Sequence, residues 1–600
     1  INLMGSFKKI FYLLSTQERK RFVLLLVMIL IMAIIDMIGV ASIAPFMLVL
    51  TNPDIVETNI ILKKIYQASK MFGVENNKDF LFILGVFVFF ILVVSLAFKA
   101  LTTYAQLRFI FMREFSIGKR LIEIYLQQPY SWFLNQHSTD LGKNILSEVT
   151  LVVGSTLAAS LRLIAASAVS ILLIVLLIIA DPKLAIITGL LLGLSYGLIF
   201  KFLHRYLARI GKERVENNEL RFKAVSEAFS GIKEVKVGSL EQVYIKRFSG
   251  PGQIFARTQA SSQAANLLPR FALEAIAFGG IMLVILYLMK QSGSFIDALP
   301  IVSLYVFAGY RLMPALQQIY ASFTSLAFNN PALNKLYDNV KNLKLSNSNE
   351  DQSVLLFNKS INLKNIFYNY PNTSRTALKN ININIPVKNT VGFVGLTGSG
   401  KTTTIDIILG LLQPQKGTLE VDGQVITEKN VKAWQRSIGY VSQQIYLSDD
   451  TVASNIAFGT AKKDINLNVV EKVSKIANLH DFIVNELPQQ YQTKIGERGV
   501  RLSGGQRQRM GIARALYHNP EVLILDEATN ALDNQTEEAV MDAVNKLSNK
   551  ITIILIAHRL NTVKNCDTIF RIDKGEIVQH GTFDTLFNYD KNFSSITKKP

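Results

Sequence analysis

The sequence predicts a membrane domain of six transmembrane helices with long cytoplasmic extensions, fused to an α/β domain built around a phosphate-binding loop. Three observations support this fold class. Long apolar segments concentrate before about residue 330, and short apolar strands separated by loops follow from about residue 354. The second part carries Gly-Leu-Thr-Gly-Ser-Gly-Lys-Thr at residues 395–402, the full Gly-x4-Gly-Lys-Thr pattern. We expect a transmembrane domain over 1–335, a linker over 336–353 and a nucleotide-binding domain over 354–600.

The apolar segments of the first part are long enough to cross a bilayer. The clearest is 80–98, which carries no charge and is sufficient for ~30 Å of hydrocarbon. Asp181-Pro182-Lys183 predicts a short turn, so the spans on either side of it must be antiparallel neighbours. The six predicted spans are roughly 22–50, 80–106, 155–180, 184–204, 271–289 and 297–325.

The net charge of +19 is distributed as in a membrane protein, and no nucleic-acid partner is expected. Residues 1–21 carry five Lys or Arg and residues 201–260 carry twelve, whereas the predicted outer loop at 51–79 has four, balanced by four acids. Positive charge marks the cytoplasmic side. Six spans then place the nucleotide-binding domain in the cytoplasm. The single cysteine, Cys566, excludes a disulfide framework and fits a reducing compartment.

The segments between spans two and three, and between spans four and five, have mixed charge and helical periodicity. We expect helices that continue into the cytoplasm, interrupted by turns at Pro129 and Pro251-Gly252. In the outer loop, an apolar stripe at helical spacing predicts a short amphipathic helix, either on the membrane surface or packed on protein. Its members are Ile61, Ile65, Ala68 and Phe72.

Ionisable residues within the predicted spans are costly in hydrocarbon, so they should face a wet cavity or a partner. One interpretation is a cationic cavity wall, because guanidinium and ammonium groups bind phosphate oxygens. The alternative is that Arg270 pairs with Glu274 one turn later, and that Lys99 and Arg162 extend to an interface. The charges concerned are Asp36, Lys99, Arg162, Arg270, Glu274 and Arg311.

The phosphate-binding loop has the local context that its chemistry requires. Val391–Val394 predicts a strand before it, and Thr403–Leu412 predicts a helix after it. Backbone N–H groups and the helix N-terminus hold phosphate oxygens, Lys401 reaches the β- and γ-phosphates, and Thr402 binds Mg²⁺. The expected ligands are therefore ATP and Mg²⁺. The predicted nucleotide-binding residues of this segment are Gly395, Leu396, Thr397, Gly398, Ser399, Gly400, Lys401, Thr402 and Thr403.

Three further segments carry candidate catalytic groups. An apolar strand ends in two acids, of which Asp526 suits the Mg²⁺ shell and Glu527 suits removal of a proton from the attacking water. Ser503-Gly504-Gly505-Gln506 predicts a second anion-binding turn before a helix. His558 follows the strand 551–557 and is a candidate phosphate contact, although an ordinary strand-end histidine has the same pattern.

Together these motifs resemble those of ATP-binding cassette (ABC) exporters of the half-transporter type, with one six-helix membrane domain fused to one nucleotide-binding domain. Leu502-Ser503-Gly504-Gly505-Gln506 is similar to the family signature. The resemblance also implies coupling helices near 128–145 and 225–245. It further implies that Tyr370 stacks on adenine, that Gln443 senses Mg²⁺ and faces the membrane domain, and that the loop 493–499 contacts the cytoplasmic helices. It also assigns Asp533 to the next loop of the cassette and makes His558 the switch histidine.

The resemblance also implies a dimer. In that family two cassettes meet head to tail, and each ATP lies between the Lys401 position of one cassette and the Ser503 position of the other. Because Glu527, Ser503 and His558 keep the active residue types, a homodimer with two competent sites is favoured.

The membrane part resembles bacterial lipid-linked oligosaccharide flippases of the protein N-glycosylation pathway. The matching segments are 98–101, 268–274 and 310–314. The resemblance implies that Lys99, Arg270 and Arg311 line a cavity in the bacterial cytoplasmic (inner) membrane and hold the pyrophosphate of a polyprenyl-diphosphate oligosaccharide. Lys99 stands where an arginine is expected, which keeps the charge but loses the two-pronged geometry.

Other functions use the same cassette motifs. An exporter of another amphipathic lipid, such as a lipid A flippase, or a multidrug exporter would have a differently lined cavity. A peptide exporter is disfavoured because no cysteine-protease domain precedes span one. A soluble cassette ATPase that acts on DNA or ribosomes would explain the basic charge but not the six apolar segments.

Overall fold

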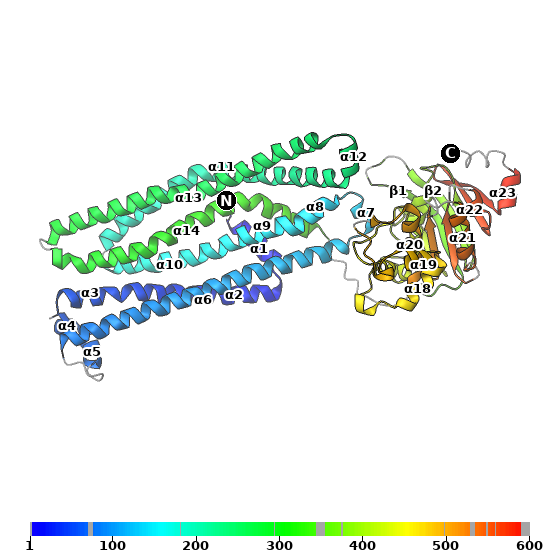
Figure 1. Cartoon of the computed structure of the whole chain (residues 1–600). Coiled ribbons are helices and arrows are strands. Elements are labelled where there is room, and N and C mark those ends of the chain that lie inside the picture. The colour runs from blue at the N-terminus through cyan, green and yellow to red at the C-terminus, as the bar shows by residue number, and fades with distance from the viewer. Residues whose placement is uncertain are drawn as a thin grey trace. The chain divides into compact units, whose positions relative to one another are not determined.

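The computed structural model divides into two compact units (Figure 1). Unit 1 comprises residues 1–128 and 135–345, and unit 2 comprises residues 129–134 and 346–600. The helix α7 (Tyr130–Phe133), inside the predicted coupling segment 128–145, therefore belongs to unit 2. The structure describes residues 3–53, 55–69, 76–180, 182–292, 295–343, 355–371, 373, 376–496, 499–528, 534–547, 550–557 and 560–589.

The described residues of unit 1 form long helices that lie side by side, as Figure 1 shows. Within it α2 packs on α6 and α10, and α14 packs on α10, α11 and α13. The helices are α1 (Leu3–Leu13), α2 (Thr16–Ala41), α3 (Ile43–Thr51), α4 (Ile55–Thr58), α5 (Ile60–Ser69), α6 (Asn77–Leu126), α8 (Ser138–Lys143), α9 (Val149–Leu151), α10 (Ala158–Ala180), α11 (Pro182–Ser230), α12 (Ile232–Val237), α13 (Glu241–Ser292) and α14 (Phe295–Asn342), with π-helical turns η2 (Asn144–Glu148) and η3 (Val152–Leu157).

The predicted spans lie in these helices. Three stretches of the described residues are long and apolar enough to cross a membrane, namely Thr16–Thr51, Asn77–Leu126 and Thr139–Ala180. The other three predicted spans lie within α11, α13 and α14. The prediction of helices that continue beyond the spans is confirmed, since α6 has 50 residues and α13 has 52, whereas about 20 suffice for the hydrocarbon core.

Proline affects two of these helices differently from the prediction. The first predicted span, 22–50, is divided between α2 and α3 at Ser42. Pro45 lies in the first turn of α3 and has no N–H to donate to the preceding turn, which accounts for the break. The predicted turn at Pro251-Gly252 is wrong, because α13 runs through Pro251 and Pro269. A helix of this length loses one hydrogen bond at each proline and keeps its remaining bonds on either side.

The outer-loop helix forms, and its described contacts with protein are made by residues outside the predicted stripe. Leu62 of α5 is buried against Val49, Val56 and Phe80, and Tyr66 packs edge-to-face on the Phe80 ring. Ile65, a member of the predicted stripe, is 43% exposed. Phe72, the last member, lies outside the described residues. In this chain α5 therefore rests on protein through Leu62 and Tyr66, and Ile65 is left on its outer side.

Unit 2 contains two sheets. In the six-stranded sheet, with order β10-β9-β3-β8-β7-β6, strands β9, β3, β8, β7 and β6 pair in parallel and β10 is antiparallel to β9. The four-stranded sheet has the order β2-β1-β4-β5 and is antiparallel. The strands are β1 (Ser360–Asn369), β2 (Thr376–Pro386), β3 (Thr390–Val394), β4 (Lys416–Val421), β5 (Gln424–Val425), β6 (Ile438–Val441), β7 (Val522–Asp526), β8 (Thr552–Ile556), β9 (Thr568–Asp573) and β10 (Glu576–Gly581).

Helices cover these sheets, and the central strands are buried on both faces. Alternate residues of β7 belong to two separate hydrophobic clusters: Leu523 and Leu525 to one, and Val522 and Ile524 to the other. A strand buried on both faces needs an uninterrupted apolar run, which is the pattern in the sequence. The helices are α15 (Lys401–Ile408), α16 (Val431–Arg436), α17 (Val452–Ile456), α18 (Leu467–Ile476), α19 (His480–Glu486), α20 (Gly504–Tyr517), α21 (Asn534–Asn545), α22 (Leu560–Val563) and α23 (Phe583–Tyr589), with 3-10 turns η4 (Lys462–Asp464) and η5 (Gln490–Gln492).

The lone cysteine lies in this core. Cys566 is a buried free thiol, packed over Gly392 of the central strand β3. Burial, with a contribution from the charge of Asp567, raises the pKa of the Cys566 thiol to about 12.

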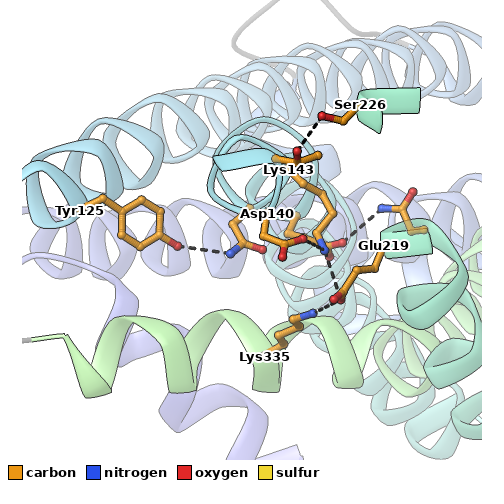
Figure 2. Close-up of polar contacts among 10 residues, drawn as sticks. Tyr125, Asp140, Lys143, Glu219, Ser226 and Lys335 are labelled. Carbon is orange, nitrogen blue, oxygen red and sulfur yellow. Dashed lines mark hydrogen bonds and ion pairs between the residues drawn. The ribbon is translucent and has the colours of Figure 1, made fainter. Parts of the chain in front are cut away.

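A polar cluster ties four helices of unit 1 together beyond the predicted spans (Figure 2). Lys143 Nζ lies 3.3 Å from Asp140 Oδ1 and 3.3 Å from Glu219 Oε2, and Lys335 of α14 also binds Glu219. The hydrogen bond from Lys335, together with the charge of Lys143, lowers the pKa of the Glu219 carboxyl. Lys143 is buried, so the cluster satisfies a charge that water cannot reach.

The π-helical turn η2 adds to this cluster. Asn144 donates to Tyr125 Oη at 3.4 Å, and Asn218 donates to Glu148 Oε1 at 3.3 Å. A π turn holds one more residue than an α turn. It therefore changes which side chains of this segment face α6 and α11.

Replacing Lys143 by Met should lower the heat resistance of unit 1. Asp140 would then lose its lysine and Glu219 would keep only Lys335, at a cost of about 1 kcal/mol, which is below the value for fully buried pairs because both acids are partly exposed. The measurement is the fraction of detergent-solubilised protein that stays monodisperse after stepwise heating. Lys119→Met is the control, because the Lys119–Glu123 pair is exposed and should contribute little. Equal midpoints for the two variants would contradict a stabilising role for the cluster.

Candidate nucleotide-binding site

The carboxyl ends of four adjacent parallel strands bring the predicted phosphate-binding loop, Gln443, Asp526 and Glu527 to a single edge of the sheet. In the order β3-β8-β7-β6, Phe393 pairs with Ile556, Ile556 with Asp526, and Leu525 with Val441. The segments that follow these strands therefore begin side by side. They are the phosphate-binding loop after β3, residue 557 onward after β8, Glu527 after β7, and Ser442-Gln443 after β6. This edge is where open parallel sheets bind ligands.

The phosphate-binding loop has the backbone that its glycines allow. Gly398 and Gly400 have φ of 78° and 112°, in the left-handed region that disfavours other residues. At Gly395, an added Cβ would lie 2.2 Å from the Ile572 carbonyl oxygen, so a side chain there would displace the loop. Gly400 is the N-cap of α15 and provides no capping side chain. The first-turn N–H groups of this helix are thus available to an anion.

Lys401 is buried beneath the loop and is held by it. Its Nζ donates to the carbonyl oxygens of Gly395 at 2.8 Å and Leu396 at 3.1 Å. Burial lowers the pKa of the Lys401 ammonium, while the nearby charges of Glu527 and Asp526 oppose that shift. The ammonium therefore sits between the loop and the two acids, where a phosphate chain would be close to both.

The structure brings together two of the three predicted catalytic residues, Gln443 and Glu527. Gln443 Nε2 donates to Glu527 Oε2 at 2.7 Å, although 84 residues separate them. Glu527 itself has a φ of 49°, and its N–H donates to the Ile556 carbonyl of the adjacent strand. A non-glycine residue in this region costs about 1–3 kcal/mol and is typical of functional sites. Because of this backbone conformation, the Glu527 side chain does not continue the alternation of side chains between the two faces of β7.

The remaining predicted ligands of Mg²⁺ lie around the same edge. Thr402, in the first turn of α15, is exposed, whereas Asp526 at the end of β7 is buried. A hydroxyl, a carboxylate and the Gln443 amide oxygen are hard oxygen donors of the kind that Mg²⁺ prefers. Ser399 Oγ of the loop is buried without a hydrogen-bond partner among the described residues. These donors fit a magnesium nucleotide, with Thr402, Asp526 and Gln443 available to the metal.

The predicted adenine-stacking residue is fixed beside the loop. Tyr370 Oη lies 3.0 Å from Thr403 Oγ1, and its ring meets Tyr368 edge-to-face. The hydroxyl of Tyr130, from α7, is close enough to contribute to the raised pKa of Tyr370, for which burial is the main cause. The segment 129–134 therefore brings an aromatic residue to the region of the predicted adenine contact.

The predicted signature segment forms the N-terminal end of helix α20. Ser503 is the N-cap of α20, and it forms a capping box in which Ser503 Oγ accepts from Gln506 N–H and Gln506 Oε1 accepts from Ser503 N–H. Gly504 and Gly505 form the first turn of α20. Ser503 is exposed, so the first turn of this helix faces outward within one chain. His558, Asp533 and residues 497–498 of the 493–499 loop lie outside the described residues, and their predicted roles stay predictions.

Two residues near the site were not predicted. Asp406 lies on α15, and burial together with the charge of Asp526 raises the pKa of the Asp406 carboxyl to about 6. Tyr440 donates to Asp526 Oδ2 at 3.5 Å, and burial raises the pKa of its hydroxyl. The one signal in the sequence was the acid in an otherwise apolar helix, Thr403–Leu412, five residues after Lys401.

The predicted cavity cations lie in a different setting. Arg311 Nη1 lies 3.1 Å from Asp36 Oδ1, so Arg311 is paired with an acid of another helix. Arg270 donates to Glu274 at 2.6 Å, which confirms the one-turn pairing given as the alternative. Lys99 is exposed, and no ion pair joins it to another residue in the described part of the chain. Two of the three cations are thus neutralised within one chain.

Comparison with known proteins finds relatives for both parts. Residues 54–314 match the family described as ABC transporter transmembrane region, and residues 378–530 match the family described as ABC transporter. An ATP-dependent lipid A-core flippase of Syntrophus aciditrophicus (strain SB) is 32% identical over 495 residues, covering 78% of this chain and 77% of that protein. An uncharacterized ABC transporter ATP-binding protein of Sinorhizobium fredii is 28% identical over 563 residues, covering 90% of this chain and 89% of that protein.

The structures of known proteins support the same fold. A bacterial Atm1-family ABC exporter with ATP bound superimposes with a TM-score of 0.76, covering 96% of this chain and 97% of that one. The identity is 21%, so this likeness concerns the fold alone.

Replacing Asp406 by Asn should stabilise the nucleotide-free cassette at pH 7.5. The raised pKa means that the folded state binds the Asp406 proton more tightly than the unfolded state, so the charged carboxylate costs stability above about pH 6. That cost fades as the pH falls from about 6 toward 4, where Asp406 becomes protonated. We expect a gain of about 1 kcal/mol at pH 7.5, discounted for partial exposure, and little difference at pH 4.5.

The fluorescence of Trp434, on α16, follows this unfolding. Its buried indole N–H donates to the carbonyl of Ile408, which lies on α15, the helix that also carries Asp406. Thermal scans in the absence of nucleotide and Mg²⁺ give the midpoints. Asp464→Asn is the control, since Asp464 is exposed and its replacement should leave the midpoint in place. A gain for Asp406→Asn that does not depend on pH would exclude the carboxylate charge as its cause.

Proposed function

This chain belongs to the ABC transporters, as an exporter-type membrane domain fused to an ATPase domain, and from that premise we propose that it works as a homodimer that flips a phosphorylated glycolipid across the bacterial cytoplasmic membrane. ATP binding and hydrolysis follow from the cassette itself. The single observation that carries the assignment is the set of nucleotide residues gathered at one edge of the sheet, in a chain that also has membrane-spanning helices.

The proposed chemistry is hydrolysis of ATP at the edge of β3, β8, β7 and β6. The N–H groups of the phosphate-binding loop and the Lys401 ammonium bind the phosphates and orient the γ-phosphoryl group. Glu527, held by Gln443, accepts a proton from the attacking water. Mg²⁺ on Thr402, Asp526 and Gln443 would neutralise charge on the phosphates. Tyr370 would stack on the adenine.

The homodimer proposal explains the second anion-binding turn. Ser503 caps α20 within one chain, and its exposed first turn is free to meet a phosphate held by another copy. One chain carries one phosphate-binding loop and one signature segment, so two copies arranged head to tail complete two sites. His558 and Asp533 would contribute from the segments after β8 and β7.

Two cargo classes fit the membrane part. The sequence resemblance at 98–101, 268–274 and 310–314 favours a polyprenyl-diphosphate oligosaccharide. The relative that is 32% identical is named an ATP-dependent lipid A-core flippase, which favours a lipid A-like glycolipid. Both cargoes combine apolar chains, sugars and phosphate. We infer that Arg311, Lys99 and Arg270 supply the cationic contacts, with Arg311 and Arg270 first having to exchange a carboxylate for the phosphate.

Glu527→Gln should bind ATP but hydrolyse it at least about 100-fold more slowly, because the amide cannot accept the proton of water. The two measurements are phosphate release and equilibrium binding of a fluorescent ATP analogue. Glu428→Gln is the control, since Glu428 is an exposed acid that follows β5 of the four-stranded sheet, outside the six-stranded sheet whose edge carries the site. Hydrolysis at the parental rate by Glu527→Gln would contradict the proposed role of this residue.

Reconstitution in liposomes tests the cargo. With ATP and Mg²⁺, the protein should move a short fluorescent polyprenyl-diphosphate glycan or a fluorescent lipid A between leaflets, and the preferred substrate identifies the cargo class. The Arg270→Gln/Arg311→Gln double variant should lose most of this transport while its basal ATP hydrolysis stays within about twofold of the parent, because these residues are far along the chain from the nucleotide motifs. Full transport by the double variant would reject a role for these cations. Transport of neither lipid by the parent would reject the phosphorylated-glycolipid assignment.

A further inference from the structure

In one ion pair of unit 1, the basic side chain is more exposed to solvent than the acidic one. Arg311 of α14 and Asp36 of α2 are 3.1 Å apart, and their side chains are 15% and 3% exposed. Ser95 of α6 donates to the same Asp36 oxygen at 3.1 Å. Three helices therefore meet at one carboxylate, and the guanidinium is the more accessible partner.

The surroundings of this pair are apolar. The neighbouring cluster combines side chains of α2, α10 and α14, with Phe98 of α6 packed against it. Its members include Met32, Ala33, Val40, Val169, Leu173, Ala308 and Leu312. An isolated charge here would be costly, so each partner satisfies a large part of the other's desolvation cost.

The ion pair leaves hydrogen-bonding groups unused on both side chains. Asp36 Oδ2 is buried and has no hydrogen-bond partner among the described residues. Arg311 has five N–H donors in a planar fork, and the ion pair engages Nη1. The remaining N–H groups lie on the more exposed partner. A ligand can therefore reach Arg311 more readily than Asp36.

We propose that Asp36 is an internal competitor for Arg311, which sets how much negative charge a lipid headgroup must carry to bind there. The inference rests on the proposed function and deepens it. A diphosphate or a phosphomonoester carries enough charge to take the guanidinium from the carboxylate, and it can bind the planar fork through two oxygens. A phosphodiester with a single negative charge, balanced by an ammonium in the same headgroup, does not displace Asp36.

This arrangement solves a problem of selectivity. Ordinary bilayer lipids present phosphodiesters at high concentration, and an unpaired arginine would bind them. A carboxylate held beside the arginine by Ser95 must be displaced before a headgroup can use the guanidinium, so a headgroup that cannot displace it gains nothing from Arg311, whereas a strongly anionic headgroup does. Specificity then comes from a built-in repulsive element as well as from attraction.

The test compares ligands that differ in charge. Detergent-solubilised full-length protein binds tritiated farnesyl diphosphate in a scintillation proximity assay, and dihexanoylphosphatidylcholine, farnesol and diphosphoryl lipid A serve as competitors. Asp36→Asn keeps the size of the side chain and an acceptor for Ser95 but removes the charge. We expect the affinity for dihexanoylphosphatidylcholine to rise about tenfold or more and that for farnesyl diphosphate to rise less, so that the ratio of the two affinities falls at least about fivefold. The affinity for farnesol should not change.

Two further variants separate the proposed role from a structural one. In Asp36→Asn/Arg311→Gln the gain should disappear, because no cation remains to be released. Glu18→Gln is the matched control: Glu18 is a buried acid of the same helix α2, paired with Arg113 of α6, and it should not alter the selectivity ratio. Should Asp36→Asn be poorly folded by size-exclusion chromatography, Asp36→Ser removes the same charge and carries the same expectation.

The outcomes also separate this inference from the proposed function. An unchanged ratio in Asp36→Asn, an equal change in Glu18→Gln, or a gain that persists without Arg311 would overturn the inference, even if liposome transport of a phosphorylated glycolipid succeeds. Failure of that transport together with an Arg311-dependent loss of selectivity in Asp36→Asn would overturn the proposed function and retain the inference. Binding of no phosphate ligand by either protein would overturn both. Stronger competition by lipid A than by farnesyl diphosphate would identify a phosphomonoester as the source of the charge.

Discussion

The parallel pairing of β3, β8, β7 and β6 is the constraint on which the nucleotide site depends. Residues far apart in the chain, such as Lys401, Gln443 and Glu527, have no local reason to approach each other. They meet because the strands before them run in the same direction and end at the same edge. The strained φ of Glu527 shows how strongly the sheet fixes this edge, since the chain accepts an unfavourable backbone there.

Several charged side chains of unit 1 form ion pairs between helices. Glu18 pairs with Arg113, Asp36 with Arg311, and Lys143 with Asp140 and Glu219. Each pair joins segments that are separated in the chain, except Lys143–Asp140, and each is at least partly buried. Such pairs oppose separation of the helices that they join, because separation leaves a partly buried charge without its partner. Of the cations that the sequence predicts for a cavity wall, Arg311 and Arg270 are therefore already paired with acids within one chain.

The sequence was informative where a pattern is local. The Gly395–Thr402 loop, the apolar strand before Asp526 and the long helices all have a periodicity or a motif of their own, and the structure has these elements. Partners across the fold were not predictable: nothing near Arg311 in the chain points to Asp36, and nothing near Asp406 points to Asp526. The contacts of α5 with protein through Leu62 and Tyr66 were also not predictable, because they depend on Val49 and Phe80 elsewhere in the chain. At Pro251 the local preference for a turn is not followed, because α13 continues as a helix through this residue.

The buried Cys566 has a practical consequence for following the transport cycle. At neutral pH a thiol with a pKa of about 12 is almost entirely protonated, and it is also shielded from solvent. Thiol-reactive spin labels or fluorophores should therefore ignore the native sequence. Reporter positions can be introduced on either unit without first removing a cysteine, so distance changes between labelled helices can be recorded in an otherwise unaltered protein.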